Sequence, residues 1–344
     1  MRTYFAWLFS FAFLVSVSMA APAPANPQLN ERGRAVLAYF QSLEARTDKR
    51  LLSGQFSNFG DGASVLIAEQ IHERTGHWPA ILGVDYAGHG GIAVDAPNRA
   101  AIAYWRAGGL VTVSTHLYDP ASTNMTGLRD KDVDIAQLLD AKTDIHAQWM
   151  AELDRVAAGL LELKHDGVVV LWRPFHEMNG DWFWWDGKDP KTFVRLWRQM
   201  FDYFTKTKAL DNLIWVYAPN HGNNTADYYP GDDYVDLAGL DAYTDFVDPD
   251  HIHGYPEIAA VKKPFGFTEF GPHGPSDPPG DYDYRRFLEG VKKNFPRTVF
   301  FMSWNARWSL DSNTNVQEML SDPWIVNRED LPNGLAGDTP PAAP

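Results

Sequence analysis

The sequence predicts a single-domain α/β fold, a (β/α)8 barrel of the TIM type. Eight short apolar runs, most of them rich in Val, Ile, Leu or Phe, recur along the 344 residues, as buried parallel strands should. Amphipathic stretches separate many of the runs, and a hydrophobic content of 45% suffices for one large core. An open doubly wound sheet is the second architecture considered, but no glycine-rich phosphate turn follows the first run. The runs cover residues 51–56, 80–86, 110–116, 168–175, 213–218, 235–243, 264–270 and 298–304.

Apolar residues at helical spacing predict helices between these strands. In the segment 190–208, six apolar side chains share one helical face: Phe193, Leu196, Trp197, Met200, Phe201 and Phe204. A further helix at 31–45 is expected to precede the barrel. The remaining expected helices cover residues 62–75, 97–107, 132–164 and 283–294.

The two ends of the chain differ in character from the barrel. Residues 1–20 combine Arg2, an apolar stretch and the small-residue site Ser18-Met19-Ala20, which is the layout of a secretory signal peptide. We expect residues 21–30 to be a flexible lead, 31–336 the catalytic barrel domain and 337–344 a disordered tail. The chain has no Cys, so an exported protein of this length must be held together by its core. These features predict a periplasmic or secreted protein.

Charge and composition restrict the partners. The formal net charge of −14 repels nucleic acid and anionic membrane surfaces, so neither is expected as a partner once the signal peptide is removed. Aromatic residues make up 14% of the chain, and flat rings can stack on the C–H faces of sugars. Most of these rings are expected to pack the core. We predict a monomer that binds a neutral polysaccharide.

The segment from Trp172 to Trp185 places one carboxylic acid, Glu177, among basic, amide and aromatic groups. Taken alone, it is typical of core packing around a satisfied ion pair. A second segment of similar character, residues 264–271, ends a short apolar strand with Glu269. Parallel strands of a barrel end at one mouth, so the sequence predicts that the two carboxylates converge there.

Most of the other predicted strands also end in polar or aromatic residues. Because strand ends converge whatever their separation in sequence, these side chains are expected to surround the two carboxylates. The strand-end residues are Asp85-Tyr86, His116, His176-Glu177, Asn220-His221, Asp241-Ala242-Tyr243, Glu269 and Trp304-Asn305.

Two carboxyl groups in different surroundings are sufficient for glycosidic bond cleavage. Glu177, beside aromatic residues that exclude water and raise its pKa, suits the proton donor. Glu269, expected near Arg173 and Tyr243, suits an ionised nucleophile. The reaction requires no metal and no cofactor, and none is predicted.

Three motifs resemble glycoside hydrolase family 26 and extend the similarity over most of the chain. They are Arg-Pro-Phe-His-Glu-Met-Asn-Gly followed by Trp-Phe-Trp-Trp at 173–185, Tyr-Pro-Gly-Asp-Asp-Tyr-Val-Asp at 229–236, and Phe-Thr-Glu-Phe-Gly at 267–271. The resemblance implies a (β/α)8 endo-β-1,4-mannanase with a retaining mechanism, in which Glu177 is the acid/base and Glu269 the nucleophile. The implied sugar-binding residues, to which we add Arg173 of the first motif, are His116, His176, Trp182, Tyr243 and Trp304. One difference from some mannanases of the family is that Asn305 follows Trp304, with Arg only at 307.

Alternatives differ in substrate or in class. The same family resemblance includes enzymes that act on mixed-linkage β-1,3-1,4-glucan and on β-1,3-xylan. A non-catalytic polysaccharide-binding barrel could use Trp182, Trp184, Trp185 and Trp304 as a stacking platform, although binding alone needs neither Glu.

Metal sites were also considered. His251 and His253, with His116, His176, His221 and His273, could form a metal cluster, but loop histidines in solvent are the preferred interpretation. Asp232, Asp233 and Asp236 match no calcium-loop spacing and are expected to form a solvated turn. Asp85 is as consistent with a structural hydrogen bond as with a substrate contact.

Overall fold

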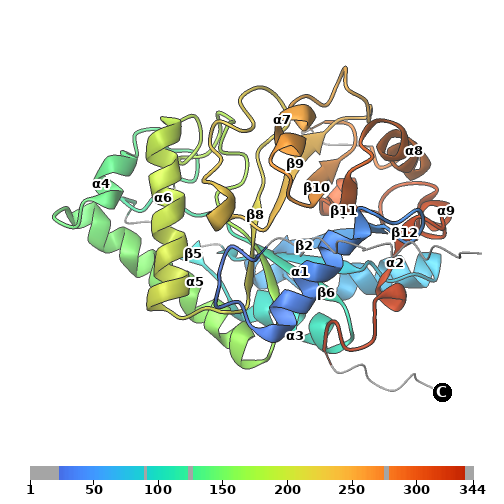
Figure 1. Cartoon of the computed structure of the whole chain (residues 1–344), viewed down its shortest axis with the longest axis horizontal. Helices are drawn as coiled ribbons and strands as arrows, with labels where there is room; N and C mark the ends of the chain where they lie inside the picture. Colours follow the sequence, from blue (N-terminus) through green and yellow to red (C-terminus); the bar gives the residue numbers. More distant parts are fainter. Residues whose placement is uncertain (1–22, 89–90, 123–126, 275–278, 338–344) are drawn as a thin grey trace, which may run out of the picture.

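A computed structural model describes residues 23–88, 91–122, 127–274 and 279–337. Eight parallel strands form a closed barrel, since β11 pairs with β10 on one side and, through Ser303 and Gln55, with β2 on the other. This closure confirms the predicted (β/α)8 fold and excludes the open sheet (Figure 1). The barrel strands are β2 (Gly54–Phe59), β3 (Ile81–Asp85), β6 (Leu110–Ser114), β7 (Val170–Arg173), β8 (Leu213–Tyr217), β9 (Leu237–Tyr243), β10 (Phe265–Gly271) and β11 (Thr298–Ser303).

Four short strands lie outside the barrel. The first predicted run, 51–56, is divided at Ser53 into β1 (Leu51–Leu52) and β2, and β1 pairs with both β11 and β12 (Ile325–Val326). β4 (Ala87–Gly88) and β5 (Gly91–Ile92) pair as an antiparallel hairpin beyond the end of β3. Neither this hairpin nor β12 was predicted, because two-residue strands leave no periodic pattern.

Helices cover the outside of the barrel, and two of the expected ones are altered. The expected helix 132–164 is two helices, because Asp140 takes an extended conformation and Thr143 caps a new helix through its side chain. The expected helix 190–208 becomes a π-helix, η2 (Tyr203–Thr207), in its last turn. The α-helices are α1 (Glu31–Leu43), α2 (Leu66–Thr75), α3 (Asp95–Arg106), α4 (Ile135–Leu139), α5 (Asp144–His165), α6 (Pro190–Asp202), α7 (Tyr255–Ala260), α8 (Tyr284–Asn294) and α9 (Val316–Leu320); the 3-10 helices are η1 (Gly60–Gly62), η3 (Asp232–Tyr234), η4 (Ala306–Trp308) and η5 (Arg328–Asp330).

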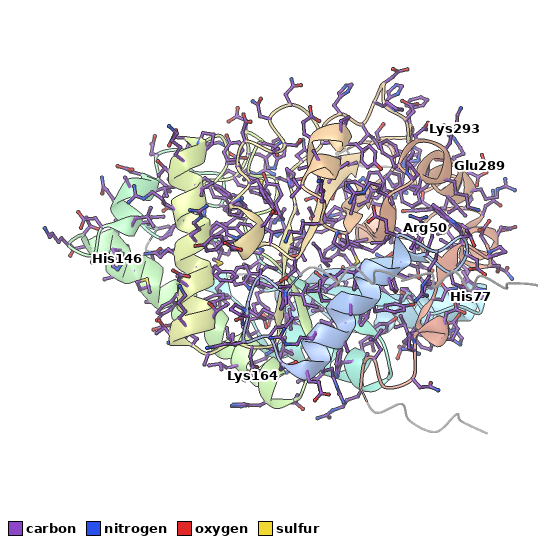
Figure 2. All side chains as sticks on the ribbon, viewed as in Figure 1. Arg50, His77, His146, Lys164, Glu289 and Lys293 are labelled. Carbon is purple, nitrogen blue, oxygen red and sulfur yellow. The ribbon has the colours of Figure 1, made fainter. Side chains whose placement is uncertain are left out.

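The amphipathic pattern of α6 shows how the helices are held on the barrel. Asp189 caps its first turn, Pro190 occupies the first helical position, and the apolar face predicted for this segment is buried. Full burial of each large apolar side chain contributes about 1.5–3 kcal/mol. Charged side chains occupy the outer faces, as Lys164 on α5 and Glu289 and Lys293 on α8 illustrate at the periphery of Figure 2.

Residues 23–30 are not the flexible lead expected for 21–30. Ala25, Asn26 and Leu29 are buried, and the Ala25 N–H donates to Asp236 Oδ1 at 2.7 Å. The same Asp236 accepts from the Trp215 N–H at 2.9 Å through its other oxygen, so it is a buried structural acceptor and not part of a solvated turn. The lead therefore packs beneath the starts of β8 and β9.

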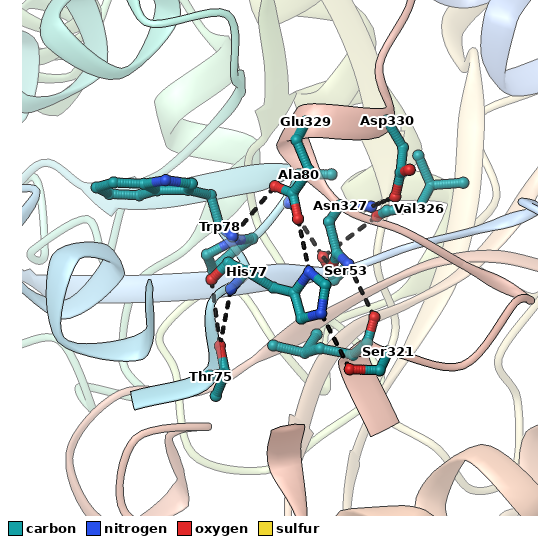
Figure 3. Close-up of polar contacts among 12 residues, drawn as sticks. Ser53, Thr75, His77, Trp78, Ala80, Ser321, Val326, Asn327, Glu329 and Asp330 are labelled. Carbon is teal, nitrogen blue, oxygen red and sulfur yellow. Dashed lines mark hydrogen bonds and ion pairs between the residues drawn. The ribbon is translucent and has the colours of Figure 1, made fainter. Parts of the chain in front are cut away.

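The C-terminal segment is fixed to the same face of the barrel by a polar network (Figure 3). His77, just before β3, contacts Glu329 Oε1 at 2.7 Å through Nδ1 and Ser321 Oγ at 3.0 Å through Nε2. Ser53, between β1 and β2, lies 3.0 Å from Asn327 Oδ1. These contacts hold residues 321–330 below the N-terminal ends of the strands, opposite the mouth.

The predicted signal peptide, residues 1–20, lies outside the described residues, as does the predicted tail apart from Gly337, which is buried. Within the described ranges, no helix combines the length and apolar character needed to cross a bilayer.

Candidate active site

A cavity of about 510 Å³ opens at the C-terminal ends of the barrel strands, within the size range of small-molecule and substrate sites. It contains most of the residues that the sequence predicted to converge. The lining residues are His116, Arg129, His176, Glu177, Trp182, Phe183, Asn220, His221, Tyr243, Glu269, Trp304 and Trp308.

Glu177 reaches the cavity through a strained turn after β7. Phe175 and Glu177 have φ of +48° and +57°, in the left-handed region that non-glycine residues rarely occupy. The Glu177 N–H donates to the Ala218 carbonyl at 2.7 Å, which ties the turn to the end of β8. Such backbone strain concentrates at functional sites, where the surrounding structure holds it.

Glu177 is only 7% exposed. Burial raises its pKa well above the usual range, and the nearby carboxylates of Glu269 and Asp241 raise it further. The Trp182 indole N–H donates to Glu177 Oε2 at 2.6 Å and opposes this effect. Gly180 leaves room for that indole, since a Cβ there would lie 2.6 Å from the ring. These surroundings favour the protonated form of Glu177.

Glu269, on β10, lies in different surroundings. Its Oε1 accepts a hydrogen bond from the Arg173 guanidinium, and its Oε2 accepts one from the Tyr243 hydroxyl at 2.6 Å. These two hydrogen bonds fix the orientation of the carboxylate. Burial, followed by the charge of Glu269, raises the pKa of Tyr243 well above its usual range, so Tyr243 remains a donor.

Arg173 lies below the cavity and does not line it, contrary to its predicted place among the substrate-binding residues. The side chain is 1% exposed and bridges three strands: besides Glu269, it donates to Asp241 Oδ2 at 2.8 Å and to Ser114 Oγ at 3.1 Å. Burial alone would lower the pKa of Arg173, but the Glu269 and Asp241 carboxylates together raise it. The arrangement makes Arg173 a positioning group for Glu269.

The carboxyl groups of Glu177, Glu269 and Asp241 are close together. One oxygen of each lies within 4.8 Å of one oxygen of each of the others. Burial raises the pKa of Asp241, as does the charge of Glu269, while Arg173 and the Thr268 hydroxyl oppose the shift. Two buried carboxyl groups at this separation favour a state in which one of them keeps its proton.

His116 and His176 form one wall of the cavity. Their Nε2 atoms lie 3.1 Å apart, and His116 Nδ1 contacts Asp85 Oδ2 at 2.9 Å. Burial lowers the pKa of His176 well below its usual value, with Arg173 contributing, so His176 is neutral. The sequence left open whether Asp85 makes a structural hydrogen bond or a substrate contact. In the structure Asp85 orients His116 and does not line the cavity.

The aromatic residues of 182–185 divide into two groups. Trp182 is half-buried and lines the cavity, as do Trp304 and Tyr243. Trp184 and Trp185 are fully buried, and their indole N–H groups donate to backbone carbonyls, Trp185 to that of His176 at 2.8 Å. Phe183 stacks on Trp185 with ring centroids 4.5 Å apart. Trp184 and Trp185 thus pack the loop that presents Trp182.

Comparison with known proteins agrees with this geometry. Residues 25–330 match the model of glycosyl hydrolase family 26. The chain belongs to that family.

Similar proteins cover nearly the whole chain. A mannan endo-1,4-beta-mannosidase of Bacillus subtilis (strain 168) is 36% identical over 93% of this chain and 94% of its own length. Mannan endo-1,4-beta-mannosidase A and B of Caldalkalibacillus mannanilyticus is 35% identical over 96% of this chain and 68% of its own length. The solved structure of Bacillus subtilis mannanase BCman superposes with a TM-score of 0.84 at 36% identity, covering 91% of this chain and 97% of that one.

Within the described ranges of this family 26 hydrolase, no group with metal-ligand spacing includes a histidine of the cluster considered above. His251 pairs with Asp248 at 2.7 Å and is 45% exposed, as expected of a loop histidine, while His273 contacts Asp245 and Asp281. Among the described residues, the one group with metal-ligand spacing is the Glu177, Asp241 and Glu269 cluster. Arg173 already bonds an oxygen of Asp241 and of Glu269, so a guanidinium supplies the positive charge there.

Several residues at or near the family 26 site had no role predicted from the sequence. Asp241 was placed at a strand end without a role, although a buried acid within an apolar strand signals a partner. Arg129 lines the cavity from a loop and Trp308 from the three-residue helix η4, and neither segment is long enough to show a periodic pattern. Asn305 points away from the cavity and donates to the Ser57 carbonyl at 3.2 Å.

Proposed function

We propose that this family 26 hydrolase is a secreted enzyme that cleaves β-1,4-mannosidic bonds in mannan, galactomannan or glucomannan with retention of configuration. The observation that carries the proposal is the pair Glu177 and Glu269, whose oxygens lie within 4.8 Å in contrasting surroundings. The names of the similar mannan endo-1,4-beta-mannosidases support the choice of polymer.

The separation of the carboxyl groups favours a retaining mechanism. Retaining glycosidases place them about 5–5.5 Å apart, whereas inverting enzymes leave about 6.5–9.5 Å for an intervening water. One oxygen of Glu177 lies within 4.8 Å of one oxygen of Glu269, which is on the retaining side of this division. The short distance supports direct attack by one carboxylate on the sugar.

Glu177 is the proposed acid and base. Its raised pKa favours the protonated form, which can deliver the proton to the glycosidic oxygen as the bond to the anomeric carbon breaks. In the second step the resulting carboxylate takes a proton from water, which attacks the anomeric carbon and releases Glu269.

Glu269 is the proposed nucleophile. One of its oxygens forms a covalent bond to the anomeric carbon while the leaving oxygen departs with the proton from Glu177. Arg173 and Tyr243 hold the carboxylate by hydrogen bonds and limit its rotation, so that it is aligned before the substrate binds.

The remaining cavity residues are proposed to bind sugar. Trp182 and Trp304 offer ring faces for the C–H surfaces of a pyranose, and His116, His176 and Tyr243 offer polar atoms for its hydroxyls. The balance of acidic over basic residues in the chain favours a neutral polymer.

Initial rates on mannan, mixed-linkage glucan and β-1,3-xylan test the substrate, and NMR of the first product anomer tests the mechanism. We expect release of reducing ends chiefly from mannan, with the β-anomer formed first. A clear preference for glucan or xylan would overturn the choice of polymer. No activity on any of the three would favour a binding protein.

Two variants test the roles. Glu269→Ala is expected to abolish turnover on every substrate, whereas Glu177→Ala should retain activity on aryl glycosides whose leaving group needs no proton. Equal losses on the activated substrate would contradict the assignment.

Export and a monomeric state complete the proposal. The signal-like residues 1–20 support export, and N-terminal sequencing of protein from the medium or periplasm should begin at Ala21. Size-exclusion chromatography with light scattering should give the mass of one chain, and a dimer mass would correct this.

A further inference from the structure

The loop after β7 that presents Trp182 is organised around a buried carboxyl group. Asp186 is 1% exposed, and its Oδ2 accepts hydrogen bonds from the backbone N–H group of Trp182 and, at 2.7 Å, from that of Phe183. A carboxyl oxygen that accepts from two successive N–H groups fixes the backbone between them. Asp186 therefore sets the direction in which the Trp182 side chain leaves the loop.

The other oxygen of Asp186 is held by a second loop, the one after β6. Lys131 of that loop forms an ion pair with Asp186 Oδ1 and donates to the Phe183 carbonyl at 3.0 Å. The Trp184 N–H donates to the Leu128 carbonyl at 3.0 Å and joins the same two loops. The ammonium group thus anchors Asp186 to a neighbouring part of the barrel mouth.

The Trp182 indole connects this ion pair to the proposed acid/base. Its N–H donates to Glu177 Oε2 at 2.6 Å. Burial raises the pKa of Glu177, and the charges of Glu269 and Asp241 raise it further. The indole bond opposes this rise, as does the Arg173 guanidinium. A hydrogen bond weakens steeply as its donor turns away, so the effect on Glu177 depends on how the indole is held.

We propose that Asp186 is a positioning residue for the proposed acid/base, because it aims the Trp182 indole N–H at Glu177. Lys131 holds Asp186 in place for this role. Asp186 does not line the cavity, so it acts without touching the substrate. The proposal rests on the proposed function, in which Glu177 is the acid and base.

The test follows the pH profile of kcat/KM on a manno-oligosaccharide in Asp186→Ala. If the indole loses its bond to Glu177, the alkaline limb moves upward, by about 1 to 2 pH units for complete loss. Charge alone predicts the opposite sign, because the ammonium of Lys131 is then unpaired and a positive charge favours the ionised form of Glu177. Asp189→Ala is the matched control, since Asp189 lies in the same segment and accepts from the Thr192 N–H at 2.9 Å. Its alkaline limb should stay in place.

A double-mutant cycle with Trp182→Phe shows whether Asp186 acts through the indole. Asp186→Ala should move the limb upward when Trp182 is present and should not move it further in Trp182→Phe. If Asp186→Ala does not fold, Lys131→Met takes its place in the cycle, because it removes the anchor of Asp186. Loss of a cation raises the limb by charge alone, but equally in both backgrounds. A limb that stays or moves down in Asp186→Ala, or equal shifts in both backgrounds for either variant, overturns the proposal.

An NMR measurement separates this proposal from the proposed function. With isotope-labelled tryptophan, the indole N–H signal of Trp182 is assigned by its absence in Trp182→Phe. The signal should move upfield in Asp186→Ala, as the hydrogen bond to Glu177 is lost, and keep its position in Asp189→Ala. An unmoved signal in Asp186→Ala would reject the positioning role. If the unaltered protein cleaves no polymer, the proposed function fails, and the same signal still decides whether Asp186 aims the indole.

Discussion

Replacing Trp182 with Phe tests how the protein sets the proton affinity of Glu177. The substitution removes the 2.6 Å hydrogen bond from the indole N–H to Glu177 Oε2 and keeps an aromatic ring. That bond stabilises the ionised carboxylate, so its loss makes the protonated form persist to higher pH. A hydrogen bond to a charged group contributes about 1.5–3 kcal/mol, and a tenfold change in proton affinity corresponds to about 1.4 kcal/mol. Because Glu177 is only 7% exposed, solvent replaces little of the lost bond.

We therefore expect the alkaline limb of the pH profile of kcat/KM to move upward by about 1 to 2 pH units in Trp182→Phe. Trp308→Phe is the matched control: Trp308 lines the same cavity, but its indole N–H donates to the Gly274 carbonyl at 2.9 Å. In the control, the alkaline limb should stay in place whether or not the rate changes. An alkaline limb that stays or moves down in Trp182→Phe would refute the reasoning.

Three further substitutions test other parts of the structure. Tyr243→Phe removes the hydroxyl donor to Glu269 and should lower kcat/KM roughly 10- to 150-fold without a large change in melting temperature; a loss below threefold would contradict the contact. Arg173→Leu leaves Asp241 and Glu269 buried without their cation, so it should lower the free energy of urea unfolding by about 3–5 kcal/mol at pH 7. A loss below about 1 kcal/mol would be inconsistent with the ion pairs of Arg173. Burial raises the pKa of Glu152 to about 7 from 4.5, so folding binds protons between these values and stability falls as pH rises through them. Glu152→Gln should accordingly stabilise the protein by up to about 3 kcal/mol above pH 7 and should have no effect on stability below pH 4.5. Equal effects of the substitution at both pH values would reject the raised pKa of Glu152.

The barrel fold and most of the residues at its mouth could be predicted, because both depend on local sequence patterns. Buried parallel strands appear as apolar runs, and closure then brings Glu177 and Glu269 together whatever lies between them. The division of 132–164 into α4 and α5 was missed because apolar residues recur on both sides of the four-residue break at 140–143, and so short a break does not disturb the pattern.

Contacts between distant residues could not be read from the sequence. The Ala and Pro content suggested a flexible lead at 21–30. Composition does not reveal that the Ala25 N–H donates a hydrogen bond to the buried Asp236. The place of Arg173 was missed for a similar reason. Its motif suggested a sugar contact, whereas the direction of its side chain depends on the closed barrel, which puts Glu269 and Asp241 within its reach.

Both described ends of the chain are held on the face opposite the active-site cavity. Ala25 bonds beneath the start of β9, and residues 321–330 are fixed beside His77 through Glu329 and Ser321. Any module or surface tether joined before residue 23 or after residue 337 would thus be attached on the face of the barrel opposite the active-site cavity. Immobilised through either end, the enzyme would present its cavity outward, toward the polymer.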